Sequence, residues 1–193
     1  FDFQEVPSPD TTGSTGFANA AFTADNSRPF TLTPNSPEAN AIVAMSSGST
    51  LTIHTNKSEI VAYGSNGALG PVNAVFESTT SYGASPVQPV RVNNFVTFVQ
   101  ATGRNVRDIV YNSDEEQFKS TDLAFVVEHF FPTLRTVAGY DSIQEMTKTE
   151  GTSSVLWCRT QLGKLYLVTL DRDYRVNAWA RVALGGTNVA DYD

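Results

Sequence analysis

Cysteine and histidine are both scarce in this chain. Its 193 residues include one cysteine, Cys158, and two histidines, His54 and His129. A single cysteine excludes an internal disulfide and a zinc site built on cysteine pairs. Between Trp157 and Arg159 in an extended segment, the thiol is predicted to be a small buried packing group and not a nucleophile. A lone thiol also fits assembly in a reducing cytoplasm.

Charge is also low. Charged residues make up 17% of the chain, against an average of about 25%, and the formal net charge is −7. A nonspecific DNA-binding surface needs clustered lysine and arginine, so this balance does not support one. An acidic wall is compatible with a passage for DNA, because weak repulsion lets the DNA slide. No run approaches the about 18 apolar residues that a membrane helix needs, so we expect a soluble protein with no membrane contact.

What the chain has in abundance is short extended segments separated by turns. Val, Phe and Tyr suit a half-buried pleated surface, and Asn and Gly tolerate the positive φ of tight hairpin turns. The clearest example predicts a three-strand antiparallel meander. Its strands are residues 87–92, 95–100 and 106–111, and its turns are at Asn93-Asn94 and Thr102-Gly103.

Two other groups of segments repeat this layout. One covers residues 41–77, with an outer strand at 72–77, and the other covers residues 143–182 with four strands. Repeated four-stranded units of about 40 to 50 residues are typical of propeller blades. The sequence therefore predicts an all-β fold of antiparallel meander units, arranged as a partial β-propeller-like array with one short helix. Three blades are too few to close a ring, which usually needs at least about four.

The short helix is predicted directly after the second group. Ser120-Thr121-Asp122 supplies an N-cap, and Pro132 ends the helix. Its apolar face is expected from residues at helical spacing. These are Leu123, Val126, Val127, Phe130 and Phe131.

The predicted domain organisation has three parts. Residues 1–35 form a loop-rich N-terminal arm, residues 36–184 the β-sheet domain, and residues 185–193 a C-terminal tail cut from a longer chain. Within and beside the arm, residues 28–33 read as a short strand and residues 35–38 as a single helical turn. Four phenylalanines in the arm favour its docking on the domain. They are Phe1, Phe3, Phe17 and Phe22.

No candidate for chemistry has the spacing of an active site, so we predict no catalytic, cofactor-binding or metal-binding residues. His54 is predicted to point outward from a Thr-rich strand, and His129 to lie on the polar side of the short helix. Neither has a cysteine or second histidine at ligand spacing. The acidic groups 114–116 and 171–173 lack the twelve-residue calcium loop and are predicted to be solvated turns. A glycosidase needs two facing carboxylates, which sequence cannot pair. The candidates are Asp114, Glu115, Glu116, Asp171 and Asp173 for calcium, and Glu59, Glu77, Asp108, Glu128 and Glu145 for glycoside cleavage.

Aromatic and arginine residues leave alternatives open. Trp157, Tyr166 and Trp179 are predicted to be core residues, with a sugar-stacking platform as the alternative. Arg104 and Arg107 flank a turn, and either form ion pairs between blades or subunits or lie at a solvated strand edge.

Several short sequence motifs follow one another along the chain in two blocks. The first block contains Ser81, Tyr82, Gly83, residues 87–90, Asn94, Phe98, Val99, Gln100, Gly103, Arg104, Val106, Arg107, Asp122, Leu123 and His129. The second contains Leu156, Trp157, Arg159, Gly163, Leu165, Thr169, Arg172, Val176, Ala178 and Trp179. Together they resemble the tail-nozzle proteins of short-tailed bacteriophages, also called tail tubular protein B or phage stabilisation protein. Asn105, where that family usually has Lys, and residues 180–182, which replace a His-rich end, depart from its pattern.

The resemblance implies a structural function without catalysis. A tail-nozzle protein forms a hexameric ring of its own copies below the tail adaptor, holds tail fibres and passes DNA on ejection. The implied location is the virion tail, assembled in the host cytoplasm. The alternatives are a carbohydrate-binding or depolymerising domain of a tail or surface protein, and a cytosolic protein-interaction propeller.

Overall fold

Twelve strands form three antiparallel sheets in the part of the chain that the structure describes. This computed structural model describes residues 31, 40–48, 50–71, 73–112, 115, 117–130, 141–151, 154–171, 174 and 176–183, with backbone alone at 128–130. Sheet 1 contains β1 (Ile42–Ser47), β2 (Leu51–Thr55), β3 (Glu59–Gly64) and β4 (Ala74–Thr80). Sheet 2 contains β5 (Val90–Val92), β6 (Phe95–Val99), β7 (Val106–Asn112) and β8 (Gln117–Asp122). Sheet 3 contains β9 (Ile143–Thr149), β10 (Ser154–Thr160), β11 (Leu165–Asp171) and β12 (Val176–Val182).

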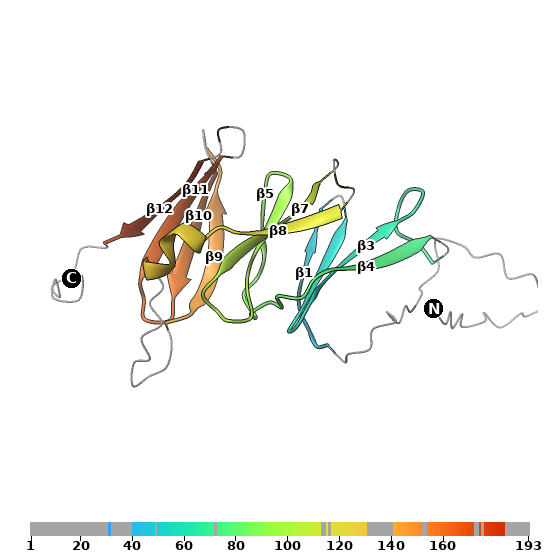
Figure 1. Ribbon diagram of the computed structural model, residues 1–193, viewed down its shortest axis with the longest axis horizontal. Coiled ribbons are helices and arrows are strands. Elements are labelled where there is room, and N and C mark those ends of the chain that lie inside the picture. Colours follow the sequence, from blue (N-terminus) through green and yellow to red (C-terminus); the bar gives the residue numbers. More distant parts are fainter. Residues whose placement is uncertain are drawn as a thin grey trace, which may run out of the picture.

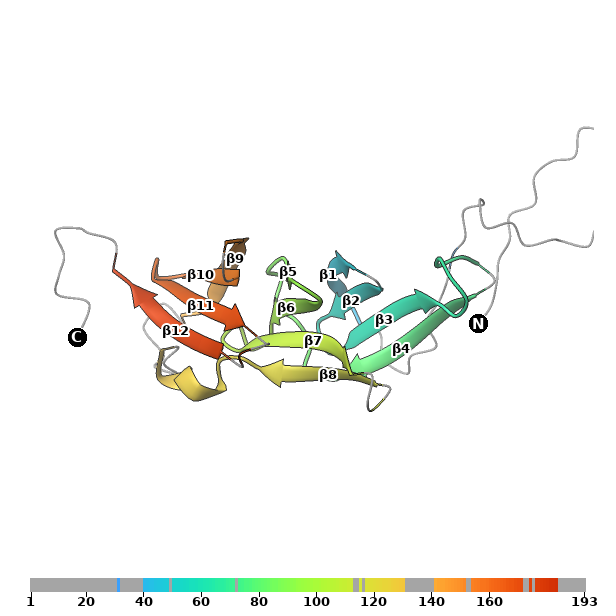
Figure 2. The same ribbon diagram turned by 90° about the horizontal axis from the view of Figure 1, so that it is seen from above.

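The three sheets stand side by side in chain order (Figure 1). Within each sheet, consecutive strands are neighbours, so each sheet is a simple meander. Figure 2 shows the first strands, β1, β5 and β9, along one side of the row and the fourth strands, β4, β8 and β12, along the other. This arrangement confirms the predicted all-β fold of meander units in a propeller-like array.

Turn chemistry explains why most predicted strands occur where expected. Asn93 has φ 52° in the two-residue loop that joins β5 to β6, where Val92 pairs with Phe95. Gly103 and Gly163 have φ values of 78° and 80° in the corresponding turns after β6 and β10. β5 begins at Val90 and not at residue 87, because Pro86 and Pro89 have no N–H to donate to a sheet.

The prediction of a helix N-cap at Ser120-Thr121-Asp122 was wrong. Residues 117–122 form β8 instead, which pairs with β7 from Arg107↔Asp122 to Asn112↔Gln117. Exposed and half-buried residues alternate along β8, as a half-covered strand requires. Asp122 keeps part of the expected capping role, because its Oδ1 accepts the N–H of Ala124 at 2.9 Å.

The helix itself differs from the predicted amphipathic α-helix. It is a 3-10 helix, η1 (Phe125–Phe130), with a kink at Val127. Val126, assigned to the apolar face, is 77% exposed, and Leu123 is buried before the helix begins. A 3-10 helix repeats every three residues, so the α-helical spacing placed the wrong residues on one face. No helix in the described ranges is long and apolar enough to cross a membrane.

Several predictions fall outside the described residues. These are the N-terminal arm (Thr31 apart), the strand at 28–33, the helical turn at 35–38, the helix end at Phe131 and Pro132, and the tail at 185–193.

The main core fills the contact between sheets 2 and 3, which we call the 2–3 seam. Fully buried Val99, Val106, Leu156 and Val168 belong to it, and Trp179 packs against it. The contact between sheets 1 and 2, the 1–2 seam, has a smaller apolar cluster and more buried polar groups. Its cluster consists of Ala84, Phe98 and Ile109, with Phe118 packed against it.

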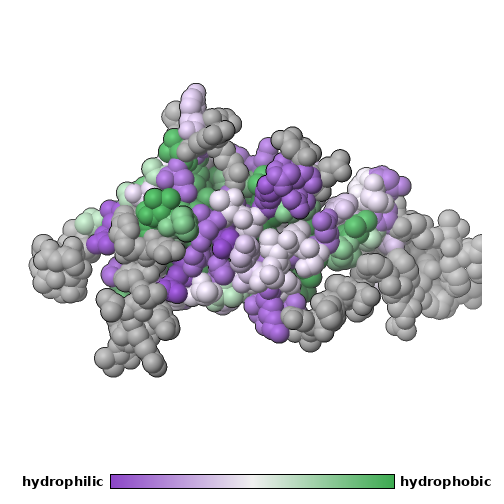
Figure 3. Space-filling model, in the orientation of Figure 1, coloured by the Kyte–Doolittle hydropathy of each residue, from purple (hydrophilic) through white to green (hydrophobic). Residues whose placement is uncertain are grey.

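Apolar surface remains at both ends of the row. In Figure 3, hydrophobic side chains gather over η1, where Phe125 is 71% exposed. On sheet 1, the sheet at the other end of the row, Ile42 and Met45 of the edge strand β1 are 62% and 54% exposed.

Candidate functional site

A hydrogen bond at the start of each sheet shows that the three sheets share one construction. In each case a backbone N–H that follows the second strand donates to the carbonyl that precedes the first strand. The pairs are Asn56 to Ala41 at 3.1 Å, Ala101 to Gly83 at 2.9 Å, and Gln161 to Ser142 at 2.8 Å. The same bond at three equivalent positions is what a repeated blade predicts.

A second repeated bond joins each sheet to the next. The N–H of Ala84 donates to the Thr55 carbonyl of sheet 1 at 2.8 Å, and the N–H of Ile143 donates to the Gly103 carbonyl of sheet 2 at 2.8 Å. Each donor directly follows a residue whose carbonyl takes part in the first repeated bond. The start of each following sheet is therefore held by main-chain bonds on both sides.

Residues 82–84, where the chain passes from sheet 1 into sheet 2, form what we call the joint of the 1–2 seam. Gly83 allows the chain to pass close to sheet 1 there. Its φ is 68°, and a Cβ there would lie 2.4 Å from the Asn56 carbonyl oxygen. Contact at that distance with backbone atoms cannot be relieved by a side-chain movement. The close approach therefore requires glycine at this position.

Arg107 ties the joint to sheet 2 through three contacts. Its guanidinium lies 3.5 Å from the centroid of the Tyr82 ring, and its Nε donates to Gln100 Oε1 at 2.9 Å. Its Nη2 lies 3.8 Å from Asp122 Oδ2, and both side chains are about 15% exposed. Asp122 also accepts a bond from Asn105 Nδ2 at 2.7 Å.

These contacts match neither predicted reading of Arg107, because its ion pair with Asp122 joins two strands of the same sheet. Arg107 is a mostly buried connection between a strand of sheet 2 and the segment that enters the sheet, and not a solvated strand edge. Arg104 is half-buried in the turn between β6 and β7.

His54 and Glu59 are fully buried polar residues of the 1–2 seam. They are cross-strand partners on β2 and β3. The His54 ring centroid lies 5.0 Å from that of Phe98 in sheet 2, so the prediction that His54 points outward was wrong. The expected alternation of buried and exposed residues does not occur on this strand, because residues 52–55 of β2 are all buried.

Burial moves the pKa values of these two groups in opposite directions. It lowers the pKa of His54 to about 4. It raises the pKa of Glu59, while hydrogen bonds from the Thr80 hydroxyl and the Tyr82 backbone and the charge of Arg107 act against that rise. His54 Nδ1 and Glu59 Oε1 have no hydrogen-bond partner among the described residues. Both groups are therefore held in their neutral forms over part of the acidic range.

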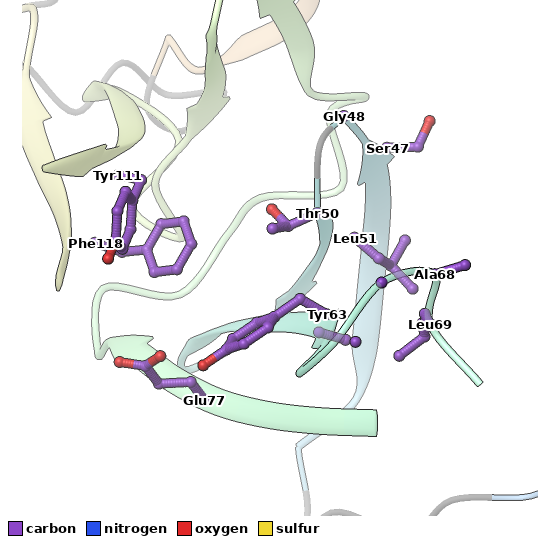
Figure 4. A pocket seen from close by; sticks show the side chains of 13 residues that line it. Ser47, Gly48, Thr50, Leu51, Tyr63, Ala68, Leu69, Glu77, Tyr111 and Phe118 are labelled. Atoms are coloured by element: carbon purple, nitrogen blue, oxygen red, sulfur yellow. The ribbon is translucent and has the colours of Figure 1, made fainter. Parts of the chain in front are cut away.

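A pocket of about 610 Å³ opens where sheets 1 and 2 diverge. Figure 4 shows Tyr111 and Phe118 of sheet 2 facing Thr50, Tyr63 and Glu77 of sheet 1 across it. Tyr111 and Phe118 are cross-strand partners whose rings meet edge-on, with centroids 5.1 Å apart. The remaining lining is small or apolar. It consists of Ser47, Gly48, Leu51, Ala62, Gly64, Gly67, Ala68 and Leu69.

The structure separates the carboxylates that a glycosidase would need to bring together. Glu59 is buried beneath the joint, Glu77 lines the pocket, and Glu145 pairs with Arg159 at 3.0 Å on the exposed face of sheet 3. Asp108 faces the 2–3 seam, where its Oδ1 accepts the Thr121 N–H at 3.0 Å. Asp108 and Asp171 line a second hollow of about 380 Å³ there. The side chain of Glu128 lies outside the described part of the chain.

Metal ligands do not gather in the described ranges, where no three His, Cys, Asp or Glu side chains are grouped to hold an ion. Glu115 is exposed and pairs with Lys119, and Asp171 Oδ1 accepts the Tyr174 N–H at 3.1 Å in a turn. The predictions for Asp114, Glu116, Asp173 and the His129 side chain fall outside the described residues.

Two core predictions are confirmed. Tyr166 and Cys158 are fully buried in the 2–3 seam, and burial raises the pKa of the Cys158 thiol to about 12. Trp179 packs against the same core and donates from Nε1 to the Leu123 carbonyl at 2.8 Å. The core prediction for Trp157 was wrong, because it lies half-buried on the opposite face of sheet 3, where it donates to Thr149 Oγ1 at 3.0 Å. The three aromatic residues therefore do not form one platform.

Sequence reasoning missed the residues of the pocket. Tyr63, Tyr111 and Phe118 lie on three strands of two sheets, and only the packing of those sheets brings them together. An aromatic residue near a strand end was the one available signal, and it is common in any β protein.

No model of a known protein family matches this chain, and a search of curated proteins found no match either. What bears on function is therefore the geometry of the 1–2 seam and the residues that build it.

Proposed function

We propose that this chain is a structural module of a bacteriophage tail nozzle, assembling with copies of itself around the channel through which DNA leaves the particle. In this function it contacts tail adaptor and fibre proteins, touches the DNA passively and catalyses no reaction. Some of the residues that carry the resemblance to the tail-nozzle family build the joint of the 1–2 seam, and this observation supports the proposal. They include Tyr82, Gly83, Gln100, Arg107 and Asp122.

The function of these residues in the fold is mechanical. Gly83 allows a close backbone crossing, and Arg107 stacks on Tyr82 while bonding Gln100. None of them lines either of the two pockets described above. A ring that keeps a fixed bore while DNA passes needs joints of this kind, because hinging between sheets would change the channel.

Exposed apolar residues at both ends of the row favour assembly. Ile42 and Met45 lie on β1, an edge strand of sheet 1. In sheet 3, Val176 begins β12 and Tyr174 lies in the turn before it. Large apolar side chains grouped on a surface are typical of contacts with another protein. Neighbouring copies in a ring would cover both ends at once.

The test is the assembly state of the protein, expressed at the full length of its reading frame. Mass photometry and negative-stain microscopy are expected to show closed rings of one copy number, and incubation with polysaccharides is expected to release no reducing ends. Monomers at micromolar concentration, or saturable polysaccharide turnover, would contradict the proposal.

One observation favours a second function, carbohydrate binding, and it is the aromatic pocket of the 1–2 seam. Depolymerisation needs two carboxylates on opposite sides of the scissile bond. Glu77 is the single carboxylate among the described residues that line this pocket. Binding without cleavage is therefore the part of this alternative that the geometry supports.

A further inference from the structure

We propose that the pocket of the 1–2 seam binds a neutral pyranose unit of a polysaccharide and does not cleave it. The pocket's size suits such a ligand. Its volume of about 610 Å³ lies within the about 300 to 1,000 Å³ of pockets that hold small molecules. The inference does not depend on ring assembly, since every lining residue comes from one chain.

The aromatic residues supply the surface that a sugar ring needs. A pyranose presents C–H groups on its faces and hydroxyls around its edge, so it stacks on an aromatic ring and hydrogen-bonds sideways. Tyr111 is 52% exposed although it is a large aromatic residue on a strand. Its edge-on contact with Phe118 fixes both rings, so a stacked ligand costs little side-chain entropy.

Polar groups stand around this aromatic surface. Figure 4 shows the hydroxyl of Thr50 and the carboxylate of Glu77 on the sheet 1 side of the pocket, with the Tyr63 ring between them. A carboxylate accepts hydrogen bonds from two adjacent hydroxyls, which gives orientation to a ligand held otherwise by stacking. A few polar groups in an otherwise apolar lining are usual for a small-molecule site.

Charge restricts the class of sugar. The described lining contains one carboxylate and no lysine, arginine or histidine. A uronic acid, a sialic acid or a phosphorylated sugar would bring a second negative charge next to Glu77, and no cation among the described lining residues balances it. The Arg91 guanidinium lies beside Gly48 but does not line the pocket. Neutral hexoses and N-acetylhexosamines meet no such repulsion.

The absence of a second carboxylate from the described lining separates binding from hydrolysis. Both retaining and inverting glycosidases place two carboxyl groups about 5 to 9.5 Å apart across the bond that they cleave. Glu59, another acid of the seam, is fully buried and bonded to Thr80. The site therefore has the groups for recognition without those for bond cleavage.

The test uses the full chain and a panel of hexasaccharides of glucose, galactose, mannose and N-acetylglucosamine. Saturation-transfer NMR is expected to show contact with the ring C–H groups of at least one member, with a Kd of about 1 mM or below. Tyr111→Ala is expected to weaken that binding about tenfold, because the stacking surface is lost. Glu77→Gln is expected to weaken it less, because one oxygen remains an acceptor.

Leu162→Ala is the control, since Leu162 is 49% exposed in the turn between β10 and β11 of sheet 3, a sheet that does not line the pocket. It is expected to leave the Kd unchanged, and circular dichroism checks that each variant is folded. The proposal is overturned if no member of the panel binds, if Tyr111→Ala binds as the wild type does, if an acidic oligosaccharide binds more tightly, or if reducing ends appear. A monomeric protein that binds sugar would contradict the ring assembly and leave this proposal standing.

Discussion

The buried pair His54 and Glu59 makes the 1–2 seam sensitive to pH at single residues. Each side chain has lost its water, and each keeps one nitrogen or oxygen without a partner among the described residues. Burial disfavours the charged form of either group, so protonation of His54 and ionisation of Glu59 both oppose folding. The charge on His54 therefore lowers the stability of the fold as the pH falls, and the charge on Glu59 lowers it as the pH rises.

The effect of His54 is expected at mildly acidic pH. Its pKa falls from 6.5 to about 4 on folding, so the unfolded chain binds the proton first as the pH drops. The stability contributed by neutral His54 is full above pH 6.5 and is lost as the pH falls toward 4, by about 3 kcal/mol. Glu59 acts the other way, because a raised pKa gives stability at low pH that is lost as the pH rises.

Comparing the wild type with His54→Gln isolates the effect of His54 on stability, because Glu59 is present in both proteins. Urea unfolding at several pH values is expected to show that the wild type loses about 3 kcal/mol relative to the variant between pH 6.5 and 4. Parallel pH profiles would show that His54 is hydrated in the folded protein.

Gly83 and Gly163 form a natural control pair for backbone geometry. Both have positive φ, but a Cβ at Gly83 would collide with the Asn56 backbone, and a Cβ at Gly163 would meet nothing within 4 Å. Gly163→Ala is expected to cost about 1 kcal/mol for the left-handed conformation alone. Gly83→Ala is expected to cost about 3 kcal/mol or more, because the sheets must also separate. Equal losses in the free energy of unfolding would mean that the joint is not close-packed.

At the scale of elements, the two seams are built in different ways. The 2–3 seam is held by a continuous apolar core, and the 1–2 seam by a small apolar cluster with buried polar groups and the Arg107 contacts. The same main-chain bond crosses both seams. The stability of that bond in each seam therefore reports how well the surrounding side chains hold the sheets together.

Arg107→Met tests this difference. Removing the guanidinium breaks the contacts to Tyr82, Gln100 and Asp122 while keeping an unbranched apolar chain. Native-state hydrogen exchange is expected to accelerate at the Ala84 amide about tenfold or more, and to stay unchanged at the Ile143 amide of the other seam. Equal acceleration at both amides would show that the variant loosens the whole fold and that Arg107 has no local role.

The strands were predictable because their turns carry strong local signals. Asn93, Gly103 and Gly163 adopt the positive φ expected of them, and the strands on either side follow. The strand at residues 117–122 could not be predicted in this way, because an Asp before an apolar run is both an N-cap signal and an ordinary strand end. Pairing with β7 decides between the two, and that pairing is a tertiary property.

The site was less predictable than the strands. The carboxylate Glu77 was a candidate for glycoside cleavage, but the aromatic residues that surround it were not connected with it. Their proximity depends on how far apart sheets 1 and 2 stand at this edge. The distance between the two sheets cannot be predicted from the spacing of residues along the chain.

For the whole molecule, the apolar ends of the row are expected to decide assembly without affecting the fold. Ile42→Glu places a charge on the exposed face of β1, where the isolated chain has solvent and a neighbouring copy would have an apolar contact. The full-length variant is expected to keep the wild-type melting temperature within about 2 °C and to lose rings in mass photometry. Asn94→Glu, an equal change of charge in an exposed turn of the middle sheet, is expected to keep them. Loss of rings in both variants would indicate a general effect of charge.

The most direct test of the nozzle function is the location of this chain in phage particles. Mass spectrometry of purified phage particles is expected to find this chain in stoichiometric amounts. Electron microscopy with a gold-labelled antibody against the chain is expected to place it at the free end of the tail. Its absence from intact particles, together with its recovery as free protein from the lysate, would contradict the account.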